Sequence, residues 1–422
     1  MIKRIFGALK TVISRRLVFK FDGVEFTYSN LSLKRLKNWF LTELAYTLKS
    51  DRVWALPTHL QVEPTSLCNL RCPVCHVVTD NKPRGNLDFV RFLEIIDEVG
   101  DYILLINLWG WGEPFMNSDT FEMIRYAENK GIKVITSTNG HFFESKKDVD
   151  RLIDSGLSVL IFALDATDKE TYNKYRHGGN FDRVLRGLEL LMLRRKERGA
   201  LLPRVNLRML VTRYNEDQIH QMKELAQRVG VDILTFKTLN VFDNEADGES
   251  LIPRNKEYRR FQYDDMGRPI QIGNTCKKLW NHPVIYRDGI VVPCDYHTGH
   301  ELALGNVFNN GRSFTNIWFG KEYRRLRARF VRGDTAGFRC DSCALNFAPL
   351  DRCVPTVIRF RGEVDENMLR PRGKTRQWQH FADCILRQSK PECTLEDGKR
   401  AVEIALAATE SASTGRVVKW KE

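Results

Sequence analysis

The stretch that decides the fold is HLQVEPTSLCNLRCPVC, residues 59–75, where a short strand pattern runs directly into a loop that carries three cysteines. Similar strand patterns recur at YILLINLW (102–109), KVITSTNG (133–140), SVLIFALD (158–165), RVNLRMLV (204–211) and DILTFKTL (232–239). Amphipathic helical patterns separate them, for example NSDTFEMIRYAENKG at 117–131. Six consecutive strand–helix units predict an α/β fold with a parallel sheet and helices outside it, as an open barrel or a doubly wound sheet.

The position of the cysteine loop indicates a functional site. In both of these folds, functional residues gather at the carboxyl ends of the strands, and the cysteine loop follows the end of the first strand. No G-x-G-x-x-G pattern follows any of the strands, so a dinucleotide site is not supported.

The composition indicates the cellular compartment of the protein and the classes of partner that it could bind. The first apolar stretch, IFGAL at 5–9, ends at Lys10 and predicts neither a signal peptide nor a membrane span. We therefore expect a cytoplasmic protein whose ten cysteines are reduced and serve metal binding or catalysis. The net charge of +13 suggests phosphorylated metabolites, nucleic acid or an anionic membrane as partners, or solubility alone. Because no base-stacking aromatic run or known binding module is present, we expect no nucleic-acid partner.

The 422 residues suffice for two or three domains, and the sequence pattern divides the chain into four stretches. Residues 1–58 form a basic N-terminal extension with a predicted helix, a hairpin around Asp22-Gly23 and a second helix at about 31–48. The first of these helices suits packing against the protein or peripheral contact with a membrane surface. Residues 59–240 hold the strand–helix units, residues 241–353 a linker and a cysteine-bearing region, and residues 354–422 a C-terminal segment with a predicted helix at 395–413.

The spacing Cys68-x3-Cys72-x2-Cys75 supplies three thiolates from one loop. A structural zinc takes four ligands, so three thiolates leave a coordination position open unless His76 completes a zinc site, which is the alternative reading. An iron–sulfur cluster held by three cysteines would leave one iron free for a small molecule. After the second strand, WGWGEP (109–114) places small residues and Glu113 at the same edge, where a carboxylate can hold an amino group.

These motifs together resemble the radical S-adenosylmethionine (SAM) superfamily, from the C-x3-C-x2-C loop to GWGEP, the counterpart of that superfamily's G-G-E-P. The resemblance covers about residues 59–345 and implies a partial (β/α)6 parallel barrel. It implies that Cys68, Cys72 and Cys75 hold a [4Fe–4S] cluster whose free iron chelates SAM. An electron, from an external donor such as flavodoxin or ferredoxin, then cleaves SAM to a 5′-deoxyadenosyl radical that abstracts a substrate hydrogen.

The resemblance also assigns cofactor-binding residues after successive strands. Glu113, beside Gly112, would hold the SAM amino group. Asn139 of TNG (138–140) and Arg176 of KYRHGG (174–179) match positions that line the nucleoside or the carboxylate, and Asp165 of FALDA (162–166) matches a family motif after the fourth strand. For each of these side chains, loop capping or ion pairing is the plain alternative.

A second set of cysteines follows the spacing Cys276-x12-Gly289-x4-Cys294, with Cys340-x2-Cys343 later in the chain. This pattern resembles the SPASM/twitch subgroup and implies one auxiliary [4Fe–4S] cluster held by four thiolates, with a second auxiliary cluster left open. A four-cysteine zinc site is the alternative. Cys353 could be an auxiliary ligand, a catalytic hydrogen donor or a buried small hydrophobic residue.

The substrate is less well defined by the sequence. The last forty-odd residues resemble the C-terminal end of Gfo/Idh/MocA sugar oxidoreductases, which hints at a sugar-modifying setting. A sugar or sugar nucleotide is the first candidate, because an acidic substrate suits the positive charge. The expected reaction is its oxidation, with the auxiliary cluster accepting the electron, or its epimerisation through a thiol such as Cys353. A peptide, as in enzymes that mature ribosomal peptides, is the second candidate, and a lipid is the third. A non-enzymatic iron–sulfur electron carrier is the alternative outside catalysis.

Overall fold

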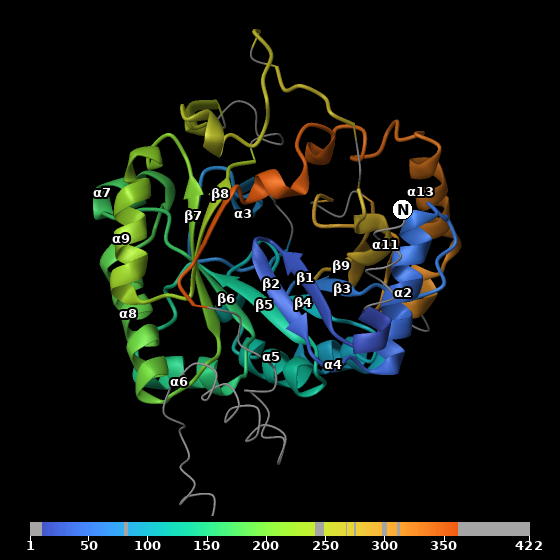
Figure 1. Ribbon diagram of the computed structural model, residues 1–422, viewed down its shortest axis with the longest axis horizontal. Coiled ribbons are helices and arrows are strands. Elements are labelled where there is room, and N and C mark those ends of the chain that lie inside the picture. The colour runs from blue at the N-terminus through green and yellow to red at the C-terminus, as the bar shows by residue number, and fades with distance from the viewer. Residues whose placement is uncertain are drawn as a thin grey trace, which may run out of the picture. The chain divides into compact units, whose positions relative to one another are not determined.

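The computed structural model describes residues 11–79, 83–240, 249–266, 268–273, 276–297, 302–309 and 313–361. Six parallel strands form the centre of a ten-stranded sheet (Figure 1). They are β3 (His59–Val62), β4 (Leu105–Asn107), β5 (Lys133–Thr138), β6 (Val159–Ala163), β7 (Arg204–Val211) and β8 (Ile233–Thr238). Their order in the sheet follows their order in the chain, without the reversal that defines a doubly wound sheet. The predicted partial (β/α)6 barrel is thereby confirmed.

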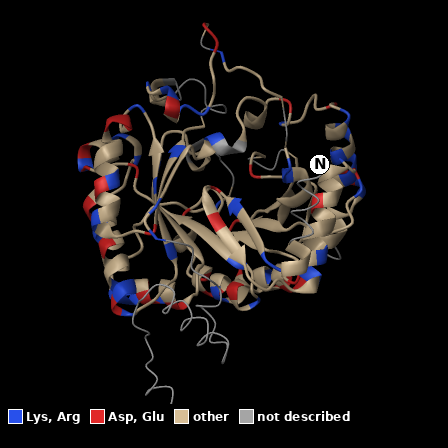
Figure 2. Cartoon of the chain, in the orientation of Figure 1, with Lys and Arg blue, Asp and Glu red and all other residues tan. Residues whose placement is uncertain are grey.

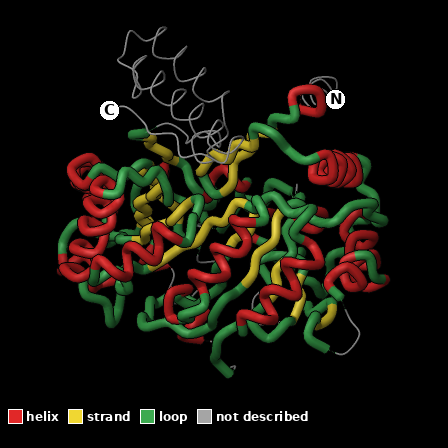
Figure 3. Tube along the Cα trace, turned by 90° about the horizontal axis from the view of Figure 1, so that it is seen from below, coloured by secondary structure: helices red, strands yellow, loops and turns green. Residues whose placement is uncertain are grey.

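Helices cover one face of this sheet (Figure 3). They are α4 (Phe89–Val99), α5 (Thr120–Asn129), α6 (Lys146–Asp154), α7 (Lys169–Tyr175), α8 (Phe181–Glu197) and α9 (Ile219–Val229). Asp88, Ser145, Asp168 and Asn180 cap the starts of α4, α6, α7 and α8 with side-chain oxygens. Alternate strand residues such as Val205, Leu207 and Met209 join the buried helix-facing core.

The N-terminal hairpin packs on the other face of the sheet. Strands β1 (Leu17–Phe21) and β2 (Val24–Tyr28) turn at Asp22 and Gly23, whose φ angles of 49° and 83° suit the tight turn that the sequence predicts. Its inner side chains pack with sheet residues from the opposite face to the helices, namely Leu105, Ile135, Val159, Ile161 and Ile233. Helix α2 (Leu33–Thr47) follows the hairpin.

The chain after residue 240 extends the same sheet at both edges. Strand β9 (Val284–Ile285) pairs in parallel with β3, and β10 (Ile290–Val292) and β11 (Gly305–Asn306) continue beyond it. Strand β12 (Thr356–Arg359) pairs antiparallel with β8. Helices α11 (Lys278–Asn281), α12 (Phe314–Trp318) and α13 (Lys321–Val331) belong to this region. The sheet therefore runs across the sequence boundary at residue 240, and β12 lies within the predicted C-terminal segment.

Several predictions concern residues outside the described ranges. The first predicted helix lies mostly in residues 1–10, and the predicted helix at 395–413 and the resemblance to Gfo/Idh/MocA proteins lie entirely beyond residue 361. In the described part of the chain, no helix is both long enough and apolar enough to cross a bilayer. Figure 2 shows Lys and Arg interleaved with Asp and Glu along the outer helices α8 and α9, so the positive excess is not gathered there.

Candidate active site

The loop after β3 brings Cys68, Cys72 and Cys75 into one partly buried cluster with Leu70 and Tyr175. Burial raises the pKa of Cys75 to about 12 and also raises the pKa of Cys68 above its ordinary value. These thiols are therefore protonated at neutral pH, and a bound metal would have to displace their protons. All three are free thiols.

Glu113 lies at the start of the turn after β4 and is 3% exposed. Its carboxylate accepts hydrogen bonds from Thr138 Oγ1 at 2.8 Å, from the Asn139 N–H at 2.7 Å and from the Phe115 N–H at 3.3 Å. No Lys, Arg or His of the described residues forms a salt bridge with it, and burial raises its pKa to about 7. A carboxylate accepts about four hydrogen bonds, so one acceptor position remains for a ligand such as an ammonium group.

The two glycines of GWGEP are required by close backbone packing. A Cβ atom at Gly110 would lie 2.4 Å from Glu63 Oε1, and one at Gly112 would lie 2.2 Å from Thr65 O. The space beside these glycines is therefore filled by residues 63–67 of the preceding loop. The Glu113 N–H also donates to Leu67 O at 2.7 Å, which ties the two loops together.

Asn139 connects the end of β5 to the cysteine loop. Its Nδ2 donates to Asn69 Oδ1 at 2.8 Å and lies 4.0 Å from Cys68 Sγ. Its Oδ1 accepts from the backbone N–H of His141 at 3.2 Å and lies 2.9 Å from His141 Nδ1. Asn139 is thus held in place on both sides and points toward the loop that carries the cysteines.

Asp165 and Arg176 form a buried ion pair beside the same loop. Arg176 Nε donates to Asp165 Oδ2 at 2.6 Å, and Arg176 Nη1 lies 3.8 Å from Cys72 Sγ. The other carboxylate oxygen of Asp165 accepts the Leu210 N–H at 2.6 Å, and Asp165 itself has a φ of 62°. The ion pair therefore connects the loop after β6 and the end of α7 to the cysteine loop at Cys72.

Of the second set of cysteines, Cys276 precedes α11, Cys294 follows β10, and Cys340 and Cys343 follow α13. Cys276, Cys294 and Cys343 are buried, and Cys340 is half-buried. Burial raises the pKa of Cys340 to about 12 and that of Cys343 to about 11, and it also raises the pKa of Cys276 and Cys294. The buried Lys278 pairs with Asp295, which neighbours Cys294 in sequence.

Cys353 lies at the carboxyl end of β8. Thr238, the last residue of β8, donates a hydrogen bond to Arg352 O at 2.8 Å and lies 3.4 Å from Cys353 O. This places Cys353 at the edge of the sheet where the other site residues gather.

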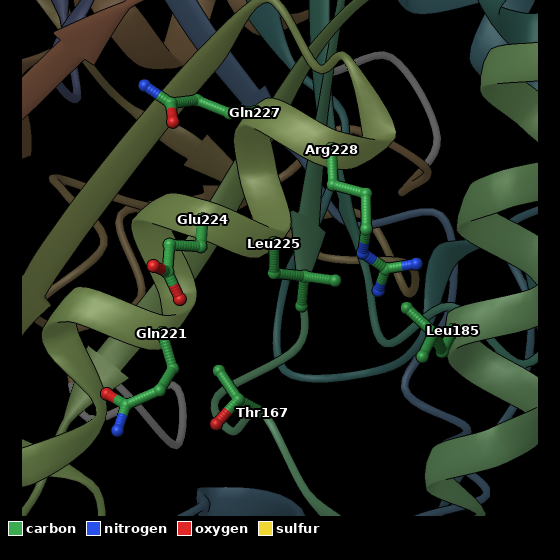
Figure 4. A pocket seen from close by; sticks show the side chains of 7 residues that line it. All are labelled: Thr167, Leu185, Gln221, Glu224, Leu225, Gln227 and Arg228. Carbon is green, nitrogen blue, oxygen red and sulfur yellow. The ribbon is translucent and has the colours of Figure 1, made fainter.

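No three or more His, Cys, Asp and Glu side chains of the described residues converge on a point that could hold a single metal ion. Each thiolate of a cubane cluster binds a different iron, so cluster ligands stand further apart than the ligands of one ion. A pocket between α8 and α9, lined by Thr167, Leu185, Gln221, Glu224, Leu225, Gln227 and Arg228, contains none of the predicted site residues (Figure 4).

Three residues of the site were missed by sequence reasoning. Asn69 holds Asn139, Thr138 holds Glu113, and Glu63 packs against Gly110. Thr138 is the last residue of β5 and Glu63 directly follows β3, and this position at a strand end is the signal that could have identified them. For Asn69, the only signal in the sequence was its position inside the cysteine loop.

The family comparisons agree with this geometry. The model of the radical SAM superfamily matches residues 62–233, and that of SPASM, an iron–sulfur cluster-binding domain, matches residues 276–344. The tungsten-containing aldehyde ferredoxin oxidoreductase cofactor-modifying protein of Pyrococcus furiosus is 25% identical, over 69% of this chain and 88% of its own. The mycofactocin maturase MftC of Mycolicibacterium smegmatis is 27% identical, over 68% of this chain and 75% of its own.

A solved structure shares the fold. SuiB of Streptococcus suis, bound to its precursor peptide SuiA, superposes with a TM-score of 0.53 at 15% identity and covers 82% of both chains. The two matched domains occur in the order and at the positions of the two cysteine sets. The chain therefore belongs to the radical SAM superfamily and is an enzyme with a radical SAM domain and a SPASM iron–sulfur domain.

Proposed function

We propose that this enzyme cleaves SAM reductively at a [4Fe–4S] cluster held by Cys68, Cys72 and Cys75 and abstracts hydrogen from a substrate carbon. The bound cluster would supply the electron that splits SAM into methionine and a 5′-deoxyadenosyl radical. The observation that carries the proposal is Glu113, a buried carboxylate without a salt-bridge partner among the described residues, whose backbone is hydrogen-bonded to Leu67 next to Cys68. An ammonium group bound there would offset the cost of burying that charge.

The neighbouring residues would serve the same ligand. Asn139 and the pair of Asp165 and Arg176 lie after successive strands at the edge where Glu113 lies. Arg176 would hold the loop near Cys72, and Asn139 would hold it near Cys68. Both contacts keep the cysteine loop and the SAM-binding edge in one arrangement, which a radical reaction needs in order to bring the reacting atoms close.

We assign an auxiliary [4Fe–4S] cluster to Cys276, Cys294, Cys340 and Cys343. The match to an iron–sulfur cluster-binding domain over residues 276–344 includes all four, and their burial suits a structural or electron-transfer cluster. Cys353 lies outside that match and stays a candidate for a further ligand or a catalytic hydrogen donor.

For the substrate, we place a peptide ahead of a sugar. SuiB, which shares the fold, has been solved with a precursor peptide, and the similar AlbA of Bacillus subtilis is a biosynthesis protein of the bacteriocin subtilosin. AlbA is 24% identical over 63% of this chain and 60% of its own length. A sugar or sugar nucleotide is the second candidate, because the positive net charge suits an acidic metabolite. An external flavodoxin or ferredoxin would deliver the electron.

The test is anaerobic reduction of the reconstituted full chain with SAM, followed by measurement of 5′-deoxyadenosine. We expect its formation by the wild type and its absence from the C68A/C72A/C75A variant. A wild type with a full cluster that makes no 5′-deoxyadenosine would favour the electron-carrier alternative instead.

A further inference from the structure

Arg287 links the SPASM region to the base of the cysteine loop. It follows β9, and its Nε donates to Ser66 Oγ at 2.8 Å, while its Nη2 donates to Pro83 O. Ser66 precedes Cys68 in the chain, and Pro83 follows Cys75. One guanidinium group from the auxiliary region therefore holds both ends of the loop that carries Cys68, Cys72 and Cys75.

The two ends of that loop also bind each other. The Ser66 N–H donates to Gly85 O at 3.0 Å, and the Gly85 N–H donates to Ser66 Oγ at 3.1 Å. An isolated antiparallel β-bridge between Thr65 and Asn86 extends this contact between the two segments. A Cβ atom at Gly85 would lie only 3.4 Å from Arg287 Nη1. The guanidinium therefore packs directly against the point where the two ends of the loop meet.

Glu63 holds the backbone of Arg287. This carboxylate is 4% exposed, and it accepts the N–H of Arg287 and the N–H of Trp111, each at 3.4 Å. Strand β3, which ends at Val62, also pairs with β9 through Val62 and Ile285. Glu63 therefore joins the turn after β9 to the loop after β4 that leads to Glu113.

We propose that Arg287, held by Glu63, is a positioning residue through which the SPASM domain sets the shape of the loop of Cys68, Cys72 and Cys75. This inference rests on the ligand role proposed for those three cysteines. Groups that orient metal ligands without touching the metal commonly change affinity or activity 10- to 100-fold when they are removed. The contacts made by the Arg287 head group suit that role because they join two segments on either side of the ligands.

The loop itself provides a readout that needs no metal. Amide hydrogen exchange of the metal-free full chain should be about 10-fold faster at Ser66 and Gly85 in R287M than in wild type. Exchange within β5, for example at Val134, should stay unchanged. R268M is the matched control, because Arg268 pairs at 3.0 Å with Asp264 within its own turn and forms no hydrogen bond or ion pair with the described residues of the cysteine loop.

A second readout follows cluster loading. In R287M, the electron paramagnetic resonance signal of the SAM-binding cluster should change while the auxiliary signal stays as in wild type, and 5′-deoxyadenosine formation should fall about 10- to 100-fold. In R287K, the single ammonium group can replace only part of the hydrogen bonds of the guanidinium. Its 5′-deoxyadenosine formation should therefore lie between that of R287M and that of wild type.

Equal exchange at Ser66 and Gly85 in wild type and R287M would overturn the proposal. If R287M raises exchange throughout the chain, R287K decides: a rise confined to the loop supports the positioning role, and no rise overturns it. A wild type that makes no 5′-deoxyadenosine counts against the proposed function alone, because the exchange experiment is done without metal.

Discussion

Arg176 donates a hydrogen bond to Asp165 over 2.6 Å, and the guanidinium of the same pair lies 3.8 Å from Cys72 Sγ. Asp165 follows β6, and Arg176 follows α7, so the ends of two elements meet the cysteine loop through one ion pair. Both side chains are largely shielded from water. The pair is therefore part of the structure of the site, as well as a source of positive charge beside a thiol.

We expect D165N to lower the free energy of unfolding by about 3 kcal/mol, because it leaves Arg176 buried without its counter-charge. Asparagine tolerates the φ of 62° as aspartate does, so backbone strain adds little. Urea unfolding of the metal-free chain measures the change. E170Q is the control, because Glu170 pairs with Lys174 on the exposed surface and its loss should cost below about 0.5 kcal/mol. Equal losses in the two variants would contradict the expectation.

The variant C68A/C72A/C75A should lose one cluster and retain the auxiliary cluster. The two cysteine sets belong to separate matched domains, so the loss of one leaves the ligands of the other in place. Iron and sulfide counts together with Mössbauer spectra measure the outcome. Retention of both clusters would show that the ligand assignment is wrong.

E113Q should reduce 5′-deoxyadenosine formation about 10- to 100-fold. Glutamine keeps an oxygen that can accept from Thr138 or Asn139, but it removes the negative charge that would hold an ammonium group, an interaction worth about 1.5–3 kcal/mol. SAM binding by calorimetry and product formation by chromatography measure the effect. As a control, E122Q alters an exposed carboxylate that pairs with Arg125 on α5, and it should behave as wild type. Unchanged SAM affinity in E113Q would remove Glu113 from the ligand site.

The stability of the metal-free chain should depend on pH through Glu63. Burial raises the pKa of Glu63 from 4.5 to about 7, so folding favours its protonated form. The stability that Glu63 contributes to folding is fully present below pH 4.5. It is lost as the pH rises through 7, and the loss amounts to about 3 kcal/mol. E63Q cannot titrate, so the stability of wild type relative to E63Q should fall over this interval.

Denaturant unfolding of both proteins at pH 5 and pH 8 measures this difference. E170Q, which alters an exposed carboxylate paired with Lys174, is measured beside them as the control for the substitution itself. A constant difference between wild type and E63Q at the two pH values would show that Glu63 does not titrate as its burial implies.

Local patterns in the sequence were enough to predict the parallel strands, the hairpin at Asp22-Gly23 and the placement of the cysteine loop after the first strand. These features depend on the alternation of apolar residues and on turn residues, which act over a few positions. The positions of Glu113, Asn139 and Asp165 at one edge follow from the same pattern, because parallel strands end together.

Contacts between distant segments could not be predicted in this way. Nothing in the sequence near Asp22 indicates that this residue meets Arg208 and Lys237, and nothing near Arg287 indicates that it holds Ser66. Likewise, the pairing of β9 with β3 makes the SPASM region part of the barrel sheet.

The sequence by itself therefore determined the kind of chemistry, through the types and spacing of the cysteines, and the class of fold. Only the tertiary structure decided which side chains support the cysteine loop. Such partners are chosen by packing and by the need to pair buried charge, and both depend on residues some two hundred positions apart in the chain.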